Sequence, residues 1–452
     1  AREQSALSLY ALHERLRGPQ LQGRAGPRAR PTPLPRPVPE HGPAAAHHQH
    51  GLEHNDRARA AHCQHGPLRR LQQRLVQVRR RQFPRDDAAA GHHAPPHARR
   101  GSRAFSLGAA AGAVFAENQT LRWLADLAGL PESAGGVFVQ GGTIGNLSAL
   151  VAARKEARRQ HPEVKRWAVA CSSEAHSSIQ SATEVMDVDL IKVPVQPDGI
   201  MRGADVKKAI DNYRAENSDR DICAIVATAG TTNLGIIDDL PTVGEVANRH
   251  KIWFHVDGAY GLAGLANEET RALFTGVEKA DSFIVDPHKW LFAPYDVCAL
   301  IYRDSNIGRE AHTQHAGYLD ALTESDEFNP SDYAIQLTRR TRGLPLWFSL
   351  AAHGTKAYSD AVAKTMETAR MAAEAVKAHP NLELLREPAL SIVAFTRKGW
   401  TMADYKAWSD KLLADQIGFV TPSTHKGEPI LRFAIVNPWT NASDIEAILA
   451  TL

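Results

Sequence analysis

The stretch SFIVDPHKWLF, residues 282–292, places an aspartate, a histidine and a lysine directly after a short apolar run. The stretch WFHVDGAY, residues 253–260, has a similar form, because its apolar and aromatic run ends at Asp257. Short apolar runs of this kind are typical of strands that are buried on both faces. The two stretches therefore predict strands of a mostly parallel sheet with charged groups at the strand ends.

Comparable apolar runs continue outward, and helical segments separate most of them. They lie at 137–140, 167–170, 190–195, 223–228 and 297–302, with helices expected at 117–130 and 146–159. This alternation predicts an α/β domain over residues 106–345, a mostly parallel sheet with helices on both faces. A smaller C-terminal α+β domain is expected over 346–452. It would contain a long helix at 344–378, strands at 382–385, 392–396 and 431–436, and helices at 402–415 and 442–452.

The composition limits the class of protein. A net charge of +3 over 452 residues is too small for a nucleic-acid-binding protein or a polybasic membrane binder. The cysteines Cys63, Cys171, Cys223 and Cys298 are far apart and lack ligand spacing, which argues against a zinc site and a disulfide framework. No apolar run approaches the roughly 18 residues of a membrane span, and we find no apolar signal-peptide region. We therefore expect a cytoplasmic protein with no metal, nucleic acid or membrane as partner.

Residues 1–105 differ from the rest in composition. Residues 1–100 hold 12 of the 26 prolines, 11 of the 21 histidines and 18 arginines against 7 acidic residues, but no lysine or isoleucine. Three interpretations compete: a disordered basic tail, a histidine-rich metal-binding segment, and a segment translated out of frame. A segment with so little apolar surface cannot offset the entropy cost of ordering. We favour the frame error, because the abundant residue types have GC-rich or C-starting codons whereas lysine and isoleucine have AT-rich ones.

Lys289 and Asp257 are the candidate catalytic residues. A lysine that follows a buried strand, between His288 and Trp290, is expected to be partly desolvated, with a lowered pKa that suits Schiff-base formation with an aldehyde. Asp257 ends a buried strand, where an unpaired carboxylate would be costly. It can cap the next helix, or it can hold a buried cation such as a protonated pyridine nitrogen. Pyridoxal phosphate chemistry needs this pair of an imine-forming lysine and an acid.

Three further segments present possible ligand groups at strand ends. QGGTIGN (140–146) lies between a strand and a helix, so its glycines and the helix N-terminus can approach a phosphate, although ordinary turns use the same residues. His176, in SSEAHSSIQSA, either caps a helix or stacks on a flat cofactor. ATAGTT (227–232) places two hydroxyl groups just past a strand. Since ligands bind outside the carboxyl ends of parallel strands, all five segments predict one site.

In this order, QGGTIGN, EAHSS, ATAGTT, HVDGAY and DPHKW resemble the motifs of the group II pyridoxal-phosphate-dependent amino-acid decarboxylases. That family includes aromatic-L-amino-acid, histidine and glutamate decarboxylases. The resemblance covers residues 110–452, whereas residues 1–105 match none of the helices that members wrap around their dimer partner. It implies the aspartate-aminotransferase-like fold type I, pyridoxal 5'-phosphate as cofactor and a homodimer. The reaction implied is decarboxylation of an L-amino acid, here an aromatic one, to the amine and CO2.

The resemblance also implies roles for single residues. Lys289 would hold the cofactor as an internal aldimine, Asp257 would pair with the pyridine nitrogen, and His176 would stack on the ring. Asp286 stands where many members have asparagine, and its role stays open because a carboxylate repels a phosphate.

Other residues of the quoted motifs would surround the same cofactor. Thr232 would lie beside the ring, while Gly142, Thr143 and His288 would approach the phosphate. Tyr318, in HAGYLD, resembles the tyrosine of a mobile loop that protonates the substrate carbon.

Two other functions stay open. The chain could be a carbon–carbon lyase or an aldehyde-forming relative with the same cofactor. Tyr318 and His176 argue against the aldehyde-forming branch, in which one of these residues is usually replaced. It could instead be an inactive protein of this fold whose basic N-terminus binds an acidic partner. Salt-sensitive binding of DNA or RNA, lost on deletion of residues 1–105, would indicate that function.

Overall fold

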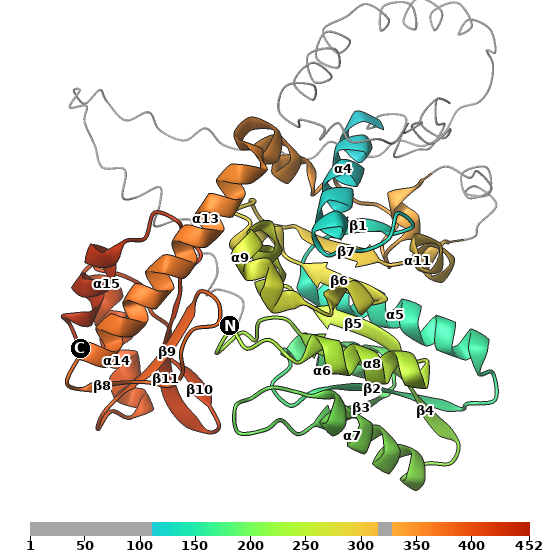
Figure 1. Cartoon of the computed structure of the whole chain (residues 1–452), viewed down its shortest axis with the longest axis horizontal. Coiled ribbons are helices and arrows are strands. Elements are labelled where there is room, and N and C mark those ends of the chain that lie inside the picture. The colour runs from blue at the N-terminus through green and yellow to red at the C-terminus, as the bar shows by residue number, and fades with distance from the viewer. Residues whose placement is uncertain (1–110, 315–327) are drawn as a thin grey trace, which may run out of the picture. The chain divides into compact units, whose positions relative to one another are not determined.

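The structure is a computed structural model that describes residues 111–314 and 328–452 (Figure 1). The anomalous segment 1–105, with its three interpretations, lies outside the described residues, and so does Tyr318. All of the described residues belong to one compact unit.

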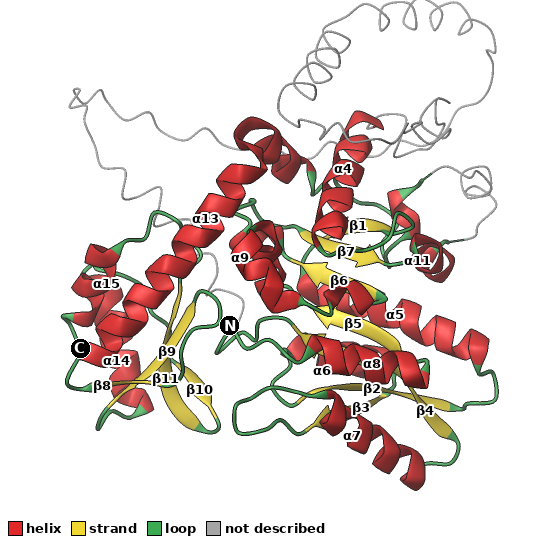
Figure 2. Ribbon diagram, viewed as in Figure 1, coloured by secondary structure: helices red, strands yellow, loops and turns green. Residues whose placement is uncertain are grey.

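The strands between residues 135 and 302 form a seven-stranded sheet in the order β1-β7-β6-β5-β4-β2-β3 (Figure 2). Its strands are β1 (Gly135–Val139), β2 (Arg166–Ser172), β3 (Asp189–Val193), β4 (Arg220–Thr228), β5 (Trp253–Asp257), β6 (Ser282–Val285) and β7 (Cys298–Tyr302). Strands β2 to β6 pair in parallel, whereas β7 is antiparallel to β1 and β6. The predicted mostly parallel sheet is confirmed, with the apolar run at 297–302 as a reversed strand.

Alternation along the strands divides the core into two layers. In β2, Trp167, Val169 and Cys171 pack with α5 (Gly142–Gln160) and α6 (Ser177–Met186). Ala168 and Ala170 pack in a second cluster with α4 (Ala111–Leu127), α7 (Gly203–Glu216) and α8 (Leu240–His250). Successive side chains of a strand point to opposite faces, so a sheet covered on both faces needs nearly continuous apolar strands.

Helix α5 begins four residues before the helix predicted at 146–159, because the glycines of QGGTIGN form its first turn. A Cβ on Gly145 would lie 2.9 Å from both Cys298 Sγ and Ile284 Cγ2. The prediction placed these glycines in a turn, whereas the structure uses their small size to pack the start of the helix directly on the sheet.

The C-terminal part has its own sheet and core. Helix α13 (Leu344–Ala378) is interrupted at Gly354, whose φ of +78° is left-handed. A four-stranded antiparallel sheet follows, in the order β10-β11-β9-β8, with β8 (Leu382–Leu384), β9 (Ile392–Arg397), β10 (Ser423–His425) and β11 (Glu428–Ala434). The end of α13 packs on it together with α14 (Met402–Ala414) and α15 (Ala442–Leu449). Strand β10 was not predicted, because its three residues contain no apolar run.

Short helices make the remaining connections: η2 (Gly261–Ala266), α9 (Glu268–Arg271), η3 (Ala272–Phe274), η4 (Val277–Lys279), α10 (Pro287–Trp290), α11 (Ser305–His312) and η5 (Pro330–Asp332). Among the helices within 111–314 and 328–452, none has the length and hydropathy of a membrane span. The same ranges hold no cluster of side chains suited to a metal ion. Cys171, Cys223 and Cys298 are buried free thiols.

Candidate active site

The carboxyl ends of the parallel strands meet along one edge of the sheet (Figure 1). QGGTIGN follows β1, EAHSS follows β2, and ATAGTT spans the end of β4. HVDGAY contains the end of β5, and DPHKW directly follows β6. The fold therefore brings the five predicted segments to the same edge, because their strands run in the same direction.

Lys289 lies in α10, the short helix that follows β6. Its Nζ donates a hydrogen bond to Asp286 Oδ2 at 2.9 Å. Burial acts to lower the pKa of Lys289, but the charge of Asp286 and this hydrogen bond outweigh it, so the pKa is raised. The expected lowered pKa is wrong for the ligand-free protein, because the effect of burial on the amine is exceeded by that of a carboxylate that faces it.

The carboxylate of Asp286 is 1% exposed and connects two parts of the site. Its Oδ2 accepts hydrogen bonds from Lys289 and, at 3.3 Å, from the backbone N–H of Gly142. His288 Nε2 lies 3.5 Å from the same oxygen. Asp286 thus joins Lys289 to the first turn of α5.

His288 is held by the chain that follows it. Its Nδ1 accepts a hydrogen bond from the backbone N–H of Val297 at 3.1 Å, so that Nε2 faces Asp286. The ring also packs on Tyr295, with centroids 4.8 Å apart. Burial lowers the pKa of His288 more than the charge of Asp286 raises it, which favours the neutral ring.

Asp257 is 5% exposed, and both of its oxygens accept hydrogen bonds. Oδ2 accepts from Asn146 Nδ2 at 2.9 Å, and Oδ1 accepts from the backbone N–H of Ala259 at 3.1 Å. The next helix, η2, begins after Tyr260, so Asp257 is not its cap. The charge of Asp257 contributes to the raised pKa of Lys289, which places the two candidate catalytic residues within electrostatic reach of each other.

His176 caps helix α6. Its Nδ1 accepts a hydrogen bond from the backbone N–H of Ser178 at 3.1 Å. The residue is nevertheless exposed, so capping leaves the ring accessible. The capping interpretation is confirmed, and the stacking role stays a prediction.

The remaining candidates differ in position. Gly142 is buried in the first turn of α5, where a Cβ would approach Asp286 Oδ2 at 3.2 Å, and Thr143 beside it is exposed. Thr232 is exposed after β4, and within the described residues no hydrogen bond joins its side chain to the other candidates. Tyr318 cannot be placed in the site, since it lies outside the described residues.

Sequence reasoning missed the residues that hold the candidates in place. Tyr260 stacks on Trp290 with ring centroids 5.2 Å apart, and Trp290 Nε1 donates to Thr365 Oγ1 of α13 at 2.8 Å. Asn146 donates to Asp257. The quoted motifs contain all three supporting residues, Asn146, Tyr260 and Trp290. Each has a polar atom in a segment expected to be buried, which was the sequence signal that could have identified them.

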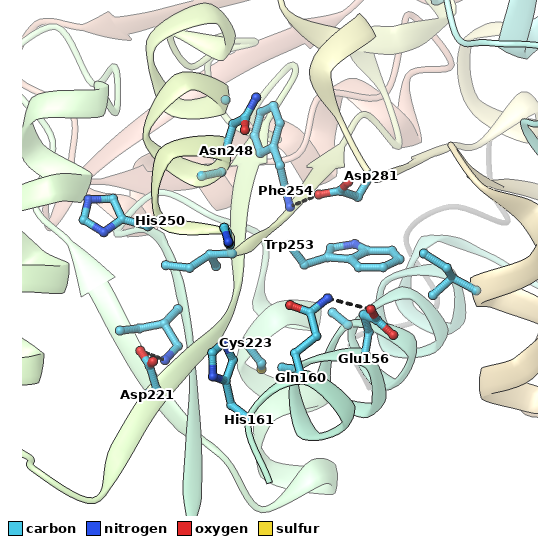
Figure 3. Close-up of a pocket in the computed structure, with 18 of the residues that line it drawn as sticks. Glu156, Gln160, His161, Asp221, Cys223, Asn248, His250, Trp253, Phe254 and Asp281 are labelled. Carbon is cyan, nitrogen blue, oxygen red and sulfur yellow. Dashed lines mark hydrogen bonds between the residues drawn. The ribbon is translucent and has the colours of Figure 1, made fainter. Parts of the chain in front are cut away.

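A cavity of about 650 Å³ opens at the opposite edge of the sheet, where Trp253 begins β5 (Figure 3). Hydrogen-bonded pairs line it: Gln160 donates to Glu156, and the backbone N–H of Phe254 donates to Asp281. None of the predicted site residues is among its lining residues. The cavity is therefore separate from the strand ends that carry the candidate chemistry.

The conserved-domain profile of pyridoxal-dependent decarboxylases matches residues 102–398. The chain belongs to this family. It is a pyridoxal-phosphate-dependent carboxy-lyase of fold type I, which confirms the predicted family, fold class, cofactor and reaction class.

Individual relatives differ in what they act on. The aromatic-L-amino-acid decarboxylase of Bacillus atrophaeus is 30% identical over 353 residues, 75% of this chain and 73% of that protein. The L-2,4-diaminobutyrate decarboxylase of Rhizobium meliloti is 30% identical over 357 residues, 75% of this chain and 69% of that protein. The 3,4-dihydroxyphenylacetaldehyde synthase of Aedes aegypti is 29% identical over 346 residues, 72% of this chain and 66% of that protein. The match spans about half of the rat and human histidine decarboxylases.

The fold is shared with solved structures. A crystal structure of Oryza sativa TDC with PLP and tryptamine superposes with a TM-score of 0.70 at 25% identity. The match covers 76% of this chain and 77% of that one.

The residues at the strand ends fit pyridoxal phosphate. Gly141 provides no side-chain cap for helix α5, and the Gly142 N–H in its first turn donates to Asp286. The backbone N–H and the exposed hydroxyl of Thr143 suit a phosphate. Lys289 offers an amine for the aldehyde, and Asp257 offers a buried carboxylate for the ring nitrogen. The charge of Asp286 beside the helix end is balanced by its ion pair with Lys289.

Proposed function

We propose that the protein converts an aromatic L-amino acid to its amine and CO2, with Lys289 as the lysine that holds pyridoxal phosphate. The observation that carries this proposal is that one edge of the sheet brings together Lys289, the buried carboxylate of Asp257 and the first turn of α5. These groups match the aldehyde, the ring nitrogen and the phosphate of the cofactor. The aromatic substrate is supported by the HAGYLD resemblance and by the similarity to the Bacillus atrophaeus enzyme.

The other candidates would complete the cofactor site. Gly142, Thr143 and His288 would hold the phosphate, while His176 and Thr232 would lie against the ring. When bound, the cofactor supplies an electron sink for the electron pair that the departing carboxylate leaves on Cα.

Proton transfers fall to side chains of the protein. Lys289 must lose a proton before its Nζ can act as a nucleophile, and the ion pair with Asp286 Oδ2, at 2.9 Å, opposes that loss. Asp257 would hold the proton of the ring nitrogen. Tyr318 would deliver a proton to the substrate Cα after CO2 has left.

The proposal includes a homodimer. Phe115 of α4 and Phe348 of α13 are 51% and 49% exposed, on two helices that contact each other. Exposed aromatic side chains on adjacent helices favour a protein partner. The family resemblance implies a second copy of this chain as that partner.

Aldehyde formation is the second candidate, because the Aedes aegypti synthase is 29% identical. His176 and Tyr318 favour the amine. Assays of amine, CO2, aldehyde and O2 uptake with tryptophan, tyrosine and phenylalanine separate the two reactions. Histidine, diaminobutyrate and glutamate serve as competing substrates, and a preference for one of them would refute the aromatic assignment.

Borohydride reduction of the cofactor-loaded protein, followed by peptide mapping, tests the role of Lys289. We expect the reduced cofactor on Lys289, and we expect Lys289→Ala to remove the visible absorbance band. A label on another lysine would refute the assignment.

A further inference from the structure

A buried hydrogen-bond network extends from the start of β5 to Asp257. Trp253 Nε1 donates to Ser282 Oγ at 2.8 Å, and Ser282 Oγ lies 2.8 Å from His255 Nδ1. His255 Nε2 lies 2.9 Å from Asn146 Oδ1, and Asn146 Nδ2 donates to Asp257 Oδ2 at 2.9 Å. His255 and Ser282 are 0% exposed and Asn146 is 1% exposed. Neither Asn146 nor His255 has a place in the reaction proposed above.

The chemistry of these groups settles where each proton lies. Asp257 and the amide oxygen of Asn146 only accept, so the Asn146 amide must donate to Asp257, and His255 must donate through Nε2. Burial lowers the pKa of His255 to about 4, more than the charge of Asp257 raises it, so the ring is neutral near pH 7. Its Nδ1 then accepts the Ser282 hydroxyl proton, and Ser282 Oγ in turn accepts from Trp253.

A second branch of the network reaches His176. The other N–H of the Asn146 amide donates to Ser178 Oγ at 2.9 Å. Ser178 Oγ lies 2.9 Å from His176 Nδ1, which also accepts the backbone N–H of Ser178. Because Nδ1 accepts, the proton of the neutral His176 ring lies on Nε2. A single amide therefore connects Asp257, which the family resemblance pairs with the pyridine nitrogen, to His176, which it stacks on the ring.

We propose that Asn146 and His255 are positioning residues that hold Asp257 and His176 in one fixed arrangement and so determine how strongly the protein holds the pyridine nitrogen. This inference rests on the role proposed above for Asp257. The physical reason is that both N–H groups of the Asn146 amide donate and its oxygen accepts from His255, so a rotation of Asp257 would leave buried polar groups unpaired. His255 keeps the amide from flipping, because only a donor at Nε2 matches its oxygen.

The test compares the dissociation constants of pyridoxal 5'-phosphate and 1-deazapyridoxal 5'-phosphate for the ligand-free protein. The analogue has carbon in place of the ring nitrogen, so the ratio of the two constants reports the contact with Asp257. We expect His255→Leu to reduce the preference for the natural cofactor about tenfold, as the loss of one buried hydrogen bond predicts. His255→Gln should retain most of it, because the glutamine amide can still donate to Asn146 Oδ1.

The Asp257→Asn variant separates failure of this inference from failure of the proposed function. Asp257→Asn should abolish the preference, and adding His255→Leu to it should cause no further loss. If Asp257→Asn abolishes the preference but His255→Leu leaves it at the wild-type value, the positioning role is wrong and the role of Asp257 stands. An unchanged preference in Asp257→Asn would overturn both.

His312→Leu is the matched control for the loss of a buried histidine. His312 is 7% exposed, and its Nε2 contacts Ser148 O at 3.0 Å, outside this network. It should lower stability without changing the ratio. Should His255→Leu fail to fold, Ser282→Ala removes only the hydroxyl that donates to His255. Nitrogen-15 NMR of the ligand-free Ser282→Ala protein should then show that His255 is no longer exclusively protonated at Nε2. The preference of this variant for pyridoxal 5'-phosphate over the 1-deaza analogue should also be reduced. An unchanged preference in Ser282→Ala would refute the proposal.

Discussion

The ion pair of Asp286 and Lys289 is the residue-scale feature that distinguishes this site. The buried carboxylate of Asp286, 2.9 Å from the Lys289 amine, favours the protonated amine. Schiff-base formation requires the neutral amine. The same carboxylate accepts a hydrogen bond from the backbone N–H of Gly142 in the first turn of α5, so it also fixes the start of this helix relative to Lys289. Asp286 thus slows the loss of the Lys289 proton, and it also holds Lys289 and the first turn of α5 in a defined geometry.

Asp286→Asn should lower the pKa of Lys289, because the charge that raises it is removed. A larger fraction of Lys289 is then neutral at a given pH, so cofactor incorporation should remain fast at lower pH. We expect the acid side of the rate profile to move down by about one pH unit, measured by stopped-flow absorbance of the ligand-free protein with pyridoxal phosphate. A profile that stays in place would show that Asp286 does not control the proton of Lys289.

Tyr318→Phe tests a residue that only the sequence identifies. The variant should bind substrate and release CO2, but it should deliver the proton to Cα slowly. Oxygen would then compete for the unprotonated carbon, and aldehyde would appear among the products. Amine yield and rate equal to those of the wild type would assign Tyr318 a structural role.

At the scale of elements, a buried histidine joins one helix to another. His312 ends α11, and its Nε2 donates to the backbone oxygen of Ser148 in α5 at 3.0 Å. Burial lowers the pKa of His312 to about 4, which the hydrogen bond to Ser148 only partly offsets. Burial between α11 and α5 therefore favours the neutral ring, although the hydrogen bond to Ser148 can form in either protonation state.

The burial of His312 should make the stability of the protein fall as the pH is lowered. A histidine with a lowered pKa contributes stability that is complete above about pH 6.5 and lost as the pH falls toward 4, since the unfolded chain then binds the proton more strongly. The contribution of His312 amounts to roughly 3 kcal/mol at most. His312→Gln should flatten this part of the profile in denaturant titrations from pH 7 to 4, because glutamine still donates but does not titrate. The exposed His353→Gln should leave the profile as it is; a wild-type slope in His312→Gln would contradict the assignment.

At the scale of the whole molecule, large apolar side chains remain exposed on the described part of the chain. Phe115, Phe348 and Ile335 are all more than 40% exposed. In the family that this chain resembles, N-terminal helices wrap the second subunit. Residues 1–100 offer Tyr10 and Phe83 as their only aromatic side chains, together with no isoleucine, so they provide little apolar surface for that purpose.

We therefore expect the chain as written to be poorly soluble and weakly active, because an uncovered apolar surface favours aggregation. Reading the gene in all three frames across codons 1–110 tests the frame-error hypothesis directly. Restoring the alternative frame upstream of about codon 107 should yield a dimer that decarboxylates. Full activity, or protease resistance of residues 1–105, in the unrepaired chain would argue decisively against a frame error.

Local patterns were enough to predict the sheet, the C-terminal α+β region and the residues that gather at the strand ends. Strands that are buried on both faces are nearly continuous apolar runs, which can be recognised in the sequence. Parallel strands place their carboxyl ends together. Asp257 and Lys289 were predicted for this reason, and they lie within electrostatic reach of each other.

Other features depended on contacts between residues far apart in the chain, and only the tertiary structure decided them. The reversal of β7 follows from its pairing with β1 and β6. The raised pKa of Lys289 depends on the direction in which the Asp286 side chain points. The link from Asn146 to Asp257 joins residues 111 positions apart. Periodicity reports which face of a strand or helix is buried, but the partners of a buried polar atom are determined by packing across the whole sheet.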